Sequence, residues 1–175
     1  MKKFSIAMLS MVLAGSMLLT GCGAKTEEAP WQTAYRETGK YLQEQDALSA
    51  GSVGGEWAVI GLSRAGLLSD ETAQSYEQTV EDYVKQAGSV RLHHAKSTEN
   101  SRAILGLTAA GYNAANMAGV DLTAGLTDMA YLRAQGTNGP IWALLALDSG
   151  NYPLPTGGTV THQALIDEIL RVQTS

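Results

Sequence analysis

The stretch Thr137–Tyr152, TNGPIWALLALDSGNY, predicts a short helix that is apolar on every side. Pro140 suits the first helical turn, because the N–H that proline lacks would have no partner there. Apolar side chains cover the whole circumference: Ile141, Trp142, Leu144, Leu145 and Leu147. Gly150 and Asn151 predict the end of the helix, since both tolerate a left-handed backbone. A helix that is apolar all round belongs inside a larger fold.

Two earlier segments resemble this helix, namely EWAVIGLSRAG at 56–66 and SRAILGLTAAG at 101–111. Aligned with IWALLALDSGN at 141–151, they share an alanine, a small residue three positions later, and a Gly or Asn at the end. The small residues are Gly61, Gly106 and Ala146, and small residues at a shared position predict tight packing among the helices. The spacing of about 40–50 residues is typical of a two-helix unit. The alternative is chance similarity among helices rich in alanine and leucine.

More polar segments alternate with these three, at 31–45, 70–87, 124–135 and 161–173. The first predicts an outer helix with one stripe at Trp31, Tyr35, Thr38 and Leu42. The second has its stripe at Ala73, Tyr76, Val80, Tyr83 and Val84, which is good helical spacing. No convincing alternating strand pattern appears, so the sequence predicts an all-α protein.

The N-terminus carries Lys2 and Lys3, an uncharged apolar run over 4–20, and then Leu19-Thr20-Gly21-Cys22. This pattern resembles the signal peptide and lipobox of bacterial lipoproteins. The resemblance implies a signal peptide over 1–21, a diacylglycerol on Cys22, a lipidated tether over 22–30 and a helical domain over 31–175. It places the domain outside the cytoplasm, held to the bacterial cell membrane by the lipid. The alternatives are an uncleaved anchor or an ordinary signal peptide.

Removal of residues 1–21 from the 175-residue chain leaves 154 residues, enough for one domain with a real core. These contain 10 Lys and Arg against 17 Asp and Glu, a net charge of −7. Because no basic cluster exists, nucleic acid is not an expected partner. The chain has one cysteine, so no disulfide forms within the domain.

Alternating inner and outer helices fit either a solenoid or an α/α toroid. The motifs Gln135-x3-Gly139-x2-Trp142 and Gly55-Glu56-Trp57 resemble the Gln…Gly-x-Trp repeat of squalene and terpene cyclases. The run 57–152 resembles the prenyltransferase/squalene-oxidase repeat of bacterial surface proteins, which are similar in fold to the transcobalamin-type domains. The resemblance implies a toroid-type repeat.

Three inner–outer pairs and one further outer helix make fewer pairs than a closed toroid of this type has. We therefore expect an open arc, in which inner helix three exposes apolar residues and invites self-association. The candidates for that exposed face are Ile141, Leu144 and Leu145.

Catalysis has little support from the residues. The cyclases that the chain resembles use an Asp-x-Asp-Asp acid, which does not occur here. Protein prenyltransferases use a zinc site, but the only cysteine is predicted to be lipidated and His93, His94 and His162 lack metal-ligand spacing. We expect no metal site and identify no cofactor, and a cyclase- or lyase-type enzyme is the alternative.

Binding has more support. Trp57, Arg102 and Trp142 occupy one equivalent position in the three inner helices, where a toroid brings the helix starts together. Two indoles and a guanidinium would bind a flat, anionic or sugar-like ligand, such as a corrinoid, an isoprenoid or a glycan. Further polar contacts are predicted from Glu56, Asn100 and Asn138. The alternatives are that both tryptophans only fill space between helices, or that the domain is a scaffold for a surface protein.

Overall fold

A computed structural model describes residues 28–45, 48–52, 54–154 and 157–173. They form seven α-helices and no β-strand, which confirms the all-α prediction for this part of the chain. The helices are α2 (Pro30–Gln43), α3 (Gly55–Arg64), α4 (Asp70–Ala87), α5 (Ser97–Ala109), α6 (Met129–Arg133), α7 (Asn138–Ser149) and α8 (His162–Gln173). The proposed signal peptide and Cys22 lie outside the described residues.

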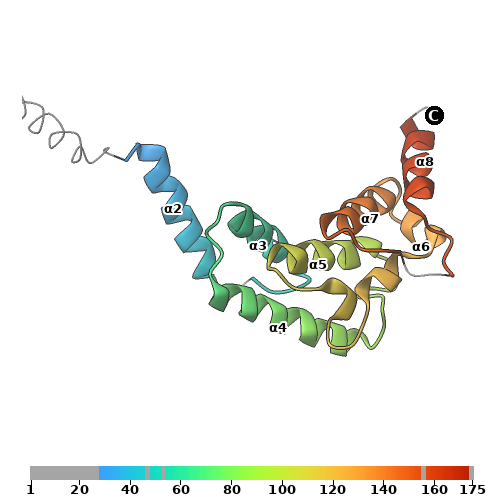
Figure 1. The fold of residues 1–175 in the computed structure, drawn as a ribbon, viewed down its shortest axis with the longest axis horizontal. Coiled ribbons are helices and arrows are strands. Elements are labelled where there is room, and N and C mark those ends of the chain that lie inside the picture. Colours follow the sequence, from blue (N-terminus) through green and yellow to red (C-terminus); the bar gives the residue numbers. More distant parts are fainter. Residues whose placement is uncertain (1–27, 46–47, 53, 155–156, 174–175) are drawn as a thin grey trace, which may run out of the picture. The chain divides into compact units, whose positions relative to one another are not determined.

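The chain divides into two compact units, residues 1–35 and 36–175, with the boundary inside α2. In the second unit α5 packs against both α3 and α7, so the three predicted inner helices lie in a row (Figure 1). These helices contribute buried side chains to the core, including Val59, Leu62, Ile104, Leu107 and Leu147.

The three inner helices end in the same way. Each is followed by a residue with positive φ, and the N–H of the next residue donates to a leucine carbonyl five positions earlier. The positive-φ residues are Gly66 (67°), Gly111 (87°) and Asn151 (51°). The hydrogen bonds run from Leu67 to Leu62, from Tyr112 to Leu107 and from Tyr152 to Leu147, each 2.9 Å long. The helix stops predicted from the sequence are therefore confirmed.

The second outer helix, α4, also follows its prediction. It begins at an N-cap, where the Ser69 hydroxyl accepts the Thr72 N–H at 3.2 Å, and it ends at Gly88 with φ of 58°. Its predicted apolar stripe is buried, with Tyr83 only partly so. Tyr76 from this stripe lies against Gly106 of α5, which shows how closely the two helices approach.

The third outer helix was predicted over 124–135, and this is wrong in detail. The chain forms a 3-10 helix, η2 (Leu122–Leu126), and then the five-residue α6. Asp121 and Asp128 each cap one of these turns: the Asp121 carboxylate accepts the Thr123 N–H at 2.9 Å, and that of Asp128 accepts the Ala130 N–H at 2.9 Å. Two caps so close together start two short elements instead of one long helix.

Two packing predictions also need correction. Gly61 was expected in a tight contact, but it is exposed and an added Cβ would meet nothing within 4 Å. The α2 stripe was expected to pack, but Trp31 is 68% exposed and Tyr35 is 46% exposed. Within the second unit, α2 does pack at Gly39, which is buried against Leu67.

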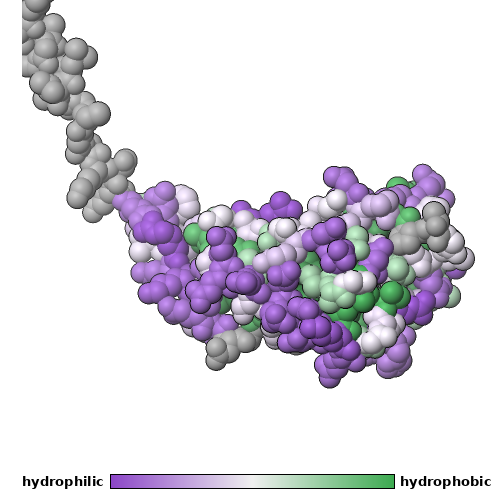
Figure 2. Space-filling view, turned by 60° about the horizontal axis from the view of Figure 1, so that its bottom comes forward, coloured by the Kyte–Doolittle hydropathy of each residue, from purple (hydrophilic) through white to green (hydrophobic). Residues whose placement is uncertain are grey.

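The described helices do not show the double ring of an α/α toroid, so the toroid and the open arc stay predictions. Inner helix α7 packs against α5, α6 and α8. Of its three residues predicted to face water, Leu145 is 48% exposed, whereas Ile141 and Leu144 are partly buried. Figure 2 shows apolar residues at the surface on the side where Figure 1 places α6, α7 and α8.

Glu168 of α8 joins α8 to α6. Its carboxylate is nearly buried and binds Arg133 of α6 at 2.7 Å and Arg171 of α8 at 2.8 Å. The hydrogen bonds from Arg171 and Arg133 lower the pKa of Glu168 from the ordinary 4.5 to about 2. A carboxylate whose pKa falls on folding stabilises the fold above its unfolded pKa.

We expect Glu168→Gln to destabilise the protein at neutral pH, with the difference from wild type lost as the pH falls from 4.5 toward 2. Below that range both proteins carry an uncharged group at residue 168. Urea unfolding of both proteins at several pH values measures this. Asp167→Asn, at an exposed neighbour, is the control. A difference that stays constant down to pH 2 would contradict the assignment.

Candidate functional site

Two indoles from different helices meet at the surface. Trp57 lies in the first turns of α3 and Trp142 in those of α7, and their ring centroids are 5.1 Å apart at a tilt of 58°. Tilted contact at this distance is a favourable arrangement of aromatic rings. Trp57 is 43% exposed and Trp142 is partly buried. The structure thus brings together two of the three residues predicted at the helix starts, and leaves one indole open to solvent.

Arg102 occupies the equivalent position on α5, the helix between α3 and α7. Its Nη2 donates to Glu99 Oε2 at 2.6 Å, and both side chains are largely shielded from solvent. Burial opposes the positive charge, but the hydrogen bond to Glu99 and the nearby Glu56 carboxylate outweigh it and raise the pKa of Arg102. The guanidinium is therefore already paired with Glu99 of its own chain and lies in the field of the Glu56 carboxylate.

Glu56 is 1% exposed, which a carboxylate tolerates only with partners. Its Oε1 accepts the backbone N–H of Gly51 at 2.7 Å, which ties the loop before α3 to the helix. Its Oε2 has no hydrogen-bond partner among the described residues. The sequence predicted Glu56 as a ligand contact, and the structure gives it a loop-fixing role with one free acceptor.

Tyr76 of α4 completes this group, and the sequence analysis identified it only as part of an apolar stripe. The side chain is fully buried, and its hydroxyl has no partner among the described residues. Burial, and then the charge of Glu56, raise the pKa of this hydroxyl far above its ordinary value of 10.0. No signal in the sequence separates such a tyrosine from one that only packs.

Glu56, Tyr76 and Arg102 form what we call the buried polar cluster. Each contributes one buried atom without a hydrogen-bond partner in the described chain: Oε2, the hydroxyl oxygen and Nε. Unpaired buried polar atoms are rare in native proteins, and here three residues carry them, with Glu56 close enough to raise the pKa of both Tyr76 and Arg102. The cluster offers an acceptor, a donor and a hydroxyl that serves as either.

The two asparagines that were predicted to contact a ligand lie in different environments. Asn100 is buried, and its amide binds three backbone groups: it accepts from Leu92 N at 2.9 Å and donates to Val90 O at 2.6 Å and Leu122 O at 3.0 Å. All of its polar atoms are thus used inside the fold, which gives Asn100 a structural role, and its predicted ligand contact stays untested. Asn138 is the first residue of α7, and its side chain is exposed to solvent.

Gln135 joins the segment between α6 and α7 to the start of α5. Its Oε1 accepts the Thr98 N–H at 2.9 Å and the Ser97 hydroxyl at 3.2 Å, and its Nε2 donates to the Thr98 hydroxyl at 3.1 Å. The side chain therefore satisfies free groups in the first turn of α5. Gly139 follows, where a Cβ would overlap the carbonyl of Leu132. Both residues of the motif before Trp142 have structural roles.

His93 stabilises the turn that precedes α5. The rings of His93 and His94 stack with centroids 4.5 Å apart, and His93 Nδ1 accepts the backbone N–H groups of Ala95 and Lys96 at 3.0 and 3.1 Å. His162 pairs with Asp148 at 3.1 Å. In the described parts of the chain, no group of three or more His, Cys, Asp and Glu is placed to hold a metal ion.

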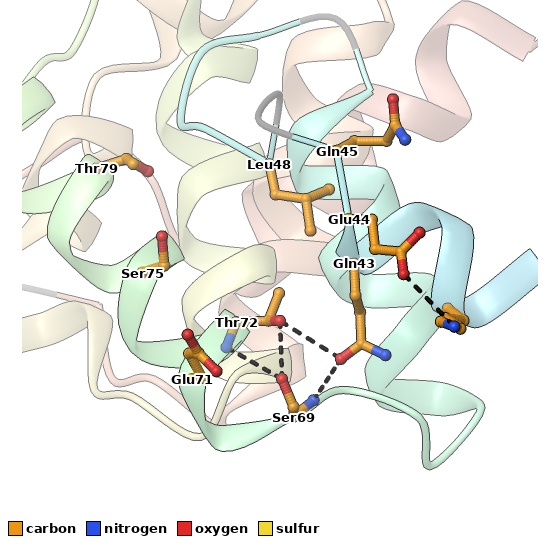
Figure 3. Close-up of a pocket in the computed structure, with 10 residues that line it drawn as sticks. Gln43, Glu44, Gln45, Leu48, Ser69, Glu71, Thr72, Ser75 and Thr79 are labelled. Atoms are coloured by element: carbon orange, nitrogen blue, oxygen red, sulfur yellow. Dashed lines mark hydrogen bonds and ion pairs between the residues drawn. The ribbon is translucent and has the colours of Figure 1, made fainter.

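A polar pocket of about 470 Å³ lies between the end of α2 and the start of α4 (Figure 3). Its groups bind one another: Gln43 Oε1 accepts from the Ser69 N–H at 2.9 Å and from the Thr72 hydroxyl at 3.4 Å. Lys40 pairs with Glu44 at 3.8 Å. Pockets of about 410, 350 and 460 Å³ lie at 87–94, at 49–86 and at 129–171. None of these four is lined by Trp57 or Trp142.

Comparison with models of protein families, with curated proteins and with solved structures found no match. Among the helices that the structure describes, none combines the length and the apolar character needed to cross a membrane. The candidate site therefore depends on its own geometry, which consists of the indole pair of α3 and α7 at the surface and the buried polar cluster of α3, α4 and α5.

Proposed function

We propose that the chain is a lipid-anchored, extracytoplasmic binding module whose ligand rests on the Trp57–Trp142 pair. The observation that carries this proposal is the contact of two indoles from separate helices, one of which stays 43% exposed. An exposed pair of large aromatic rings held in fixed orientation is typical of a binding surface, because each ring gives much contact area at little entropic cost.

The charges favour a neutral ligand. The sequence left an anionic or a sugar-like ligand open, but Arg102 is already paired with Glu99 and lies near Glu56. Corrinoids and isoprenoids bury most of their surface in enclosed cavities, whereas the Trp57 indole is 43% exposed at the surface. A glycan, whose apolar sugar face stacks on an indole, fits this open surface best.

The toroid-type repeat belongs to the same proposal. Its support is the shared ending of α3, α5 and α7, and the Gln135 side chain that joins the motif before Trp142 to the first turn of α5. The exposed Leu145 supports the idea of an incomplete ring that self-associates or takes up a surface protein. These features support a repeat of helix pairs related to the prenyltransferase-like proteins.

The lipid anchor rests on Leu19-Thr20-Gly21-Cys22. We expect protein extracted from bacterial membranes to begin at Cys22 and to carry a diacylglycerol on its sulfur, and we expect Cys22→Ser to abolish the modification. Mass spectrometry of the intact protein measures both. An unmodified Cys22 at the mature N-terminus would contradict the anchor without bearing on the indole pair.

Neutral oligosaccharides, corrinoids and polyprenyl compounds should be compared by tryptophan fluorescence and thermal shift. We expect binding of a glycan, and a loss of at least about tenfold in affinity for Trp57→Ala, which corresponds to 1.4 kcal/mol. Because Trp57 is half exposed, its loss should change the melting temperature little. Trp31→Ala, which removes an exposed indole from α2, is the control and should bind like wild type.

Two other results would direct the assignment elsewhere. Turnover of a polyprenyl substrate that a single Asp or Glu substitution abolishes would support a cyclase- or lyase-type enzyme. Absence of any small ligand, with a surface protein bound through α7 and α8, would support a scaffold. Equal glycan affinity of wild type and Trp57→Ala would overturn the site.

A further inference from the structure

Helix α2 carries three large aromatic side chains that remain exposed, and two of them, Trp31 and Tyr35, lie on one side of the helix, whereas Tyr41, which is 61% exposed, does not. Trp31 is 68% exposed and Tyr35 is 46% exposed. Residues four apart lie on one face of a helix, so the two rings form one aromatic strip, which we call the Trp31–Tyr35 face. Isolated exposed apolar residues are ordinary, but neighbouring aromatic rings on one helical face need an explanation.

The opposite side of the helix is strongly polar. At 3.6 residues per turn, the charged residues of α2, which are Arg36, Glu37 and Lys40, project away from Trp31 and Tyr35. A helix with aromatic rings on one side and charges on the other is typical of a segment that lies at the surface of a bilayer. Trp and Tyr in particular prefer this region, because each has an apolar body and a polar tip.

We propose that the Trp31–Tyr35 face of α2 rests in the headgroup region of the membrane, and this rests on the proposed lipid anchor at Cys22. The aromatic strip begins nine residues after Cys22. A chain of that length spans at most about 30 Å even when fully extended. The anchored protein therefore keeps α2 within reach of the lipid surface at all times.

The attraction comes from the aromatic rings and not from charge. The chain after residue 21 has a net charge of −7, so anionic lipids repel it. The three charged residues of α2 named above carry two positive charges and one negative charge, which is too little to outweigh the charge of the whole chain. Two rings bind a bilayer weakly alone, but the anchor raises their effective concentration at the surface into the range where weak contacts form.

Lipidated protein in vesicles of phosphatidylcholine and phosphatidylglycerol, with or without brominated acyl chains, tests this. The difference in emission between wild type and Trp31→Phe reports Trp31 alone. We expect this difference spectrum to lie at shorter wavelengths in vesicles than for the protein in solution without lipid. We also expect most of its intensity to be lost in vesicles with brominated acyl chains. Tyr35→Ser should reduce the quenching, whereas Tyr41→Ser, roughly a quarter turn away from Trp31, should not.

Unquenched Trp31 on protein that still floats with the vesicles would overturn the proposal. Association into dimers through Trp31, seen by sedimentation without lipid and lost in Trp31→Phe, would do so as well, because a second copy would then cover the face. If mass spectrometry finds no lipid on Cys22, the anchor fails separately. The Cys22 thiol, which is the only one in the chain, can then be coupled to a maleimide lipid. The quenching measurement on this protein still tests whether Trp31 enters the headgroup region.

Discussion

Asn100→Ala is expected to destabilise the protein by roughly 3 kcal/mol, because it leaves two buried backbone groups and one partly buried backbone group without partners at about 1–3 kcal/mol each. These groups are the N–H of Leu92 and the carbonyls of Val90 and Leu122. The Asn100 amide is therefore the link between the loop after α4, helix α5 and η2. The loss corresponds to a fall in melting temperature on the order of 10 °C for a domain of this size.

Asn138→Ala is the matched control, since Asn138 is exposed at the start of α7. It should change the stability by less than about 0.5 kcal/mol, as is usual for surface substitutions. Asn100→Asp should be no better than alanine, because it removes both donors and buries a charge. Thermal unfolding followed by circular dichroism measures all three. A stable Asn100→Ala variant would mean that water or a shifted loop replaces the amide.

Asn100 also shows where prediction from sequence stops. Its place near the start of an inner helix made it a ligand candidate, since the sequence does not reveal what its side chain faces. The three groups that it binds lie 8, 10 and 22 residues away in the chain. Partners at such separations depend on the packed fold, so local pattern alone cannot assign them.

Features set by local chemistry were predictable. The ends of the inner helices at Gly66, Gly111 and Asn151 follow from the backbone preferences of these residues. The buried stripe of α4 follows from apolar residues at helical spacing. The third outer helix failed for a related reason: Asp121 and Asp128 are both N-cap residues, and their competing caps outweighed the apolar pattern that surrounds them.

The site was predictable only in part. The repeat alignment placed Trp57, Arg102 and Trp142 at one level, and the structure brings the two indoles together. Tyr76 was missed because its role depends on which groups of α3 and α5 face it, and the sequence does not show these groups. The packing of the glycines depends in the same way on which side chains face them. Gly61 and Gly106 are equivalent in sequence, yet only Gly106 faces another helix.

Gly106→Ala is therefore expected to destabilise the protein, although alanine favours helices over glycine by about 1 kcal/mol. An added Cβ would overlap the Tyr76 hydroxyl and come within 2.8 Å of its ring carbon Cζ. Tyr76 is fully buried, so its ring has no room to withdraw. Overpacking of this kind typically costs about 1–3 kcal/mol. Urea unfolding should show a lower midpoint with an unchanged slope.

Gly61→Ala is the control at the equivalent position of α3, where nothing lies within 4 Å of the added Cβ. It should stabilise the protein by roughly 0.5–1 kcal/mol, because only the helix preference of alanine remains. The two substitutions are the same chemically, so opposite signs isolate the contact with Tyr76. Tyr76→Phe removes the unpartnered hydroxyl and should relieve part of the cost of Gly106→Ala, with the close Cζ accounting for the rest. Equal effects at residues 61 and 106 would mean that α4 and α5 do not approach each other through this glycine.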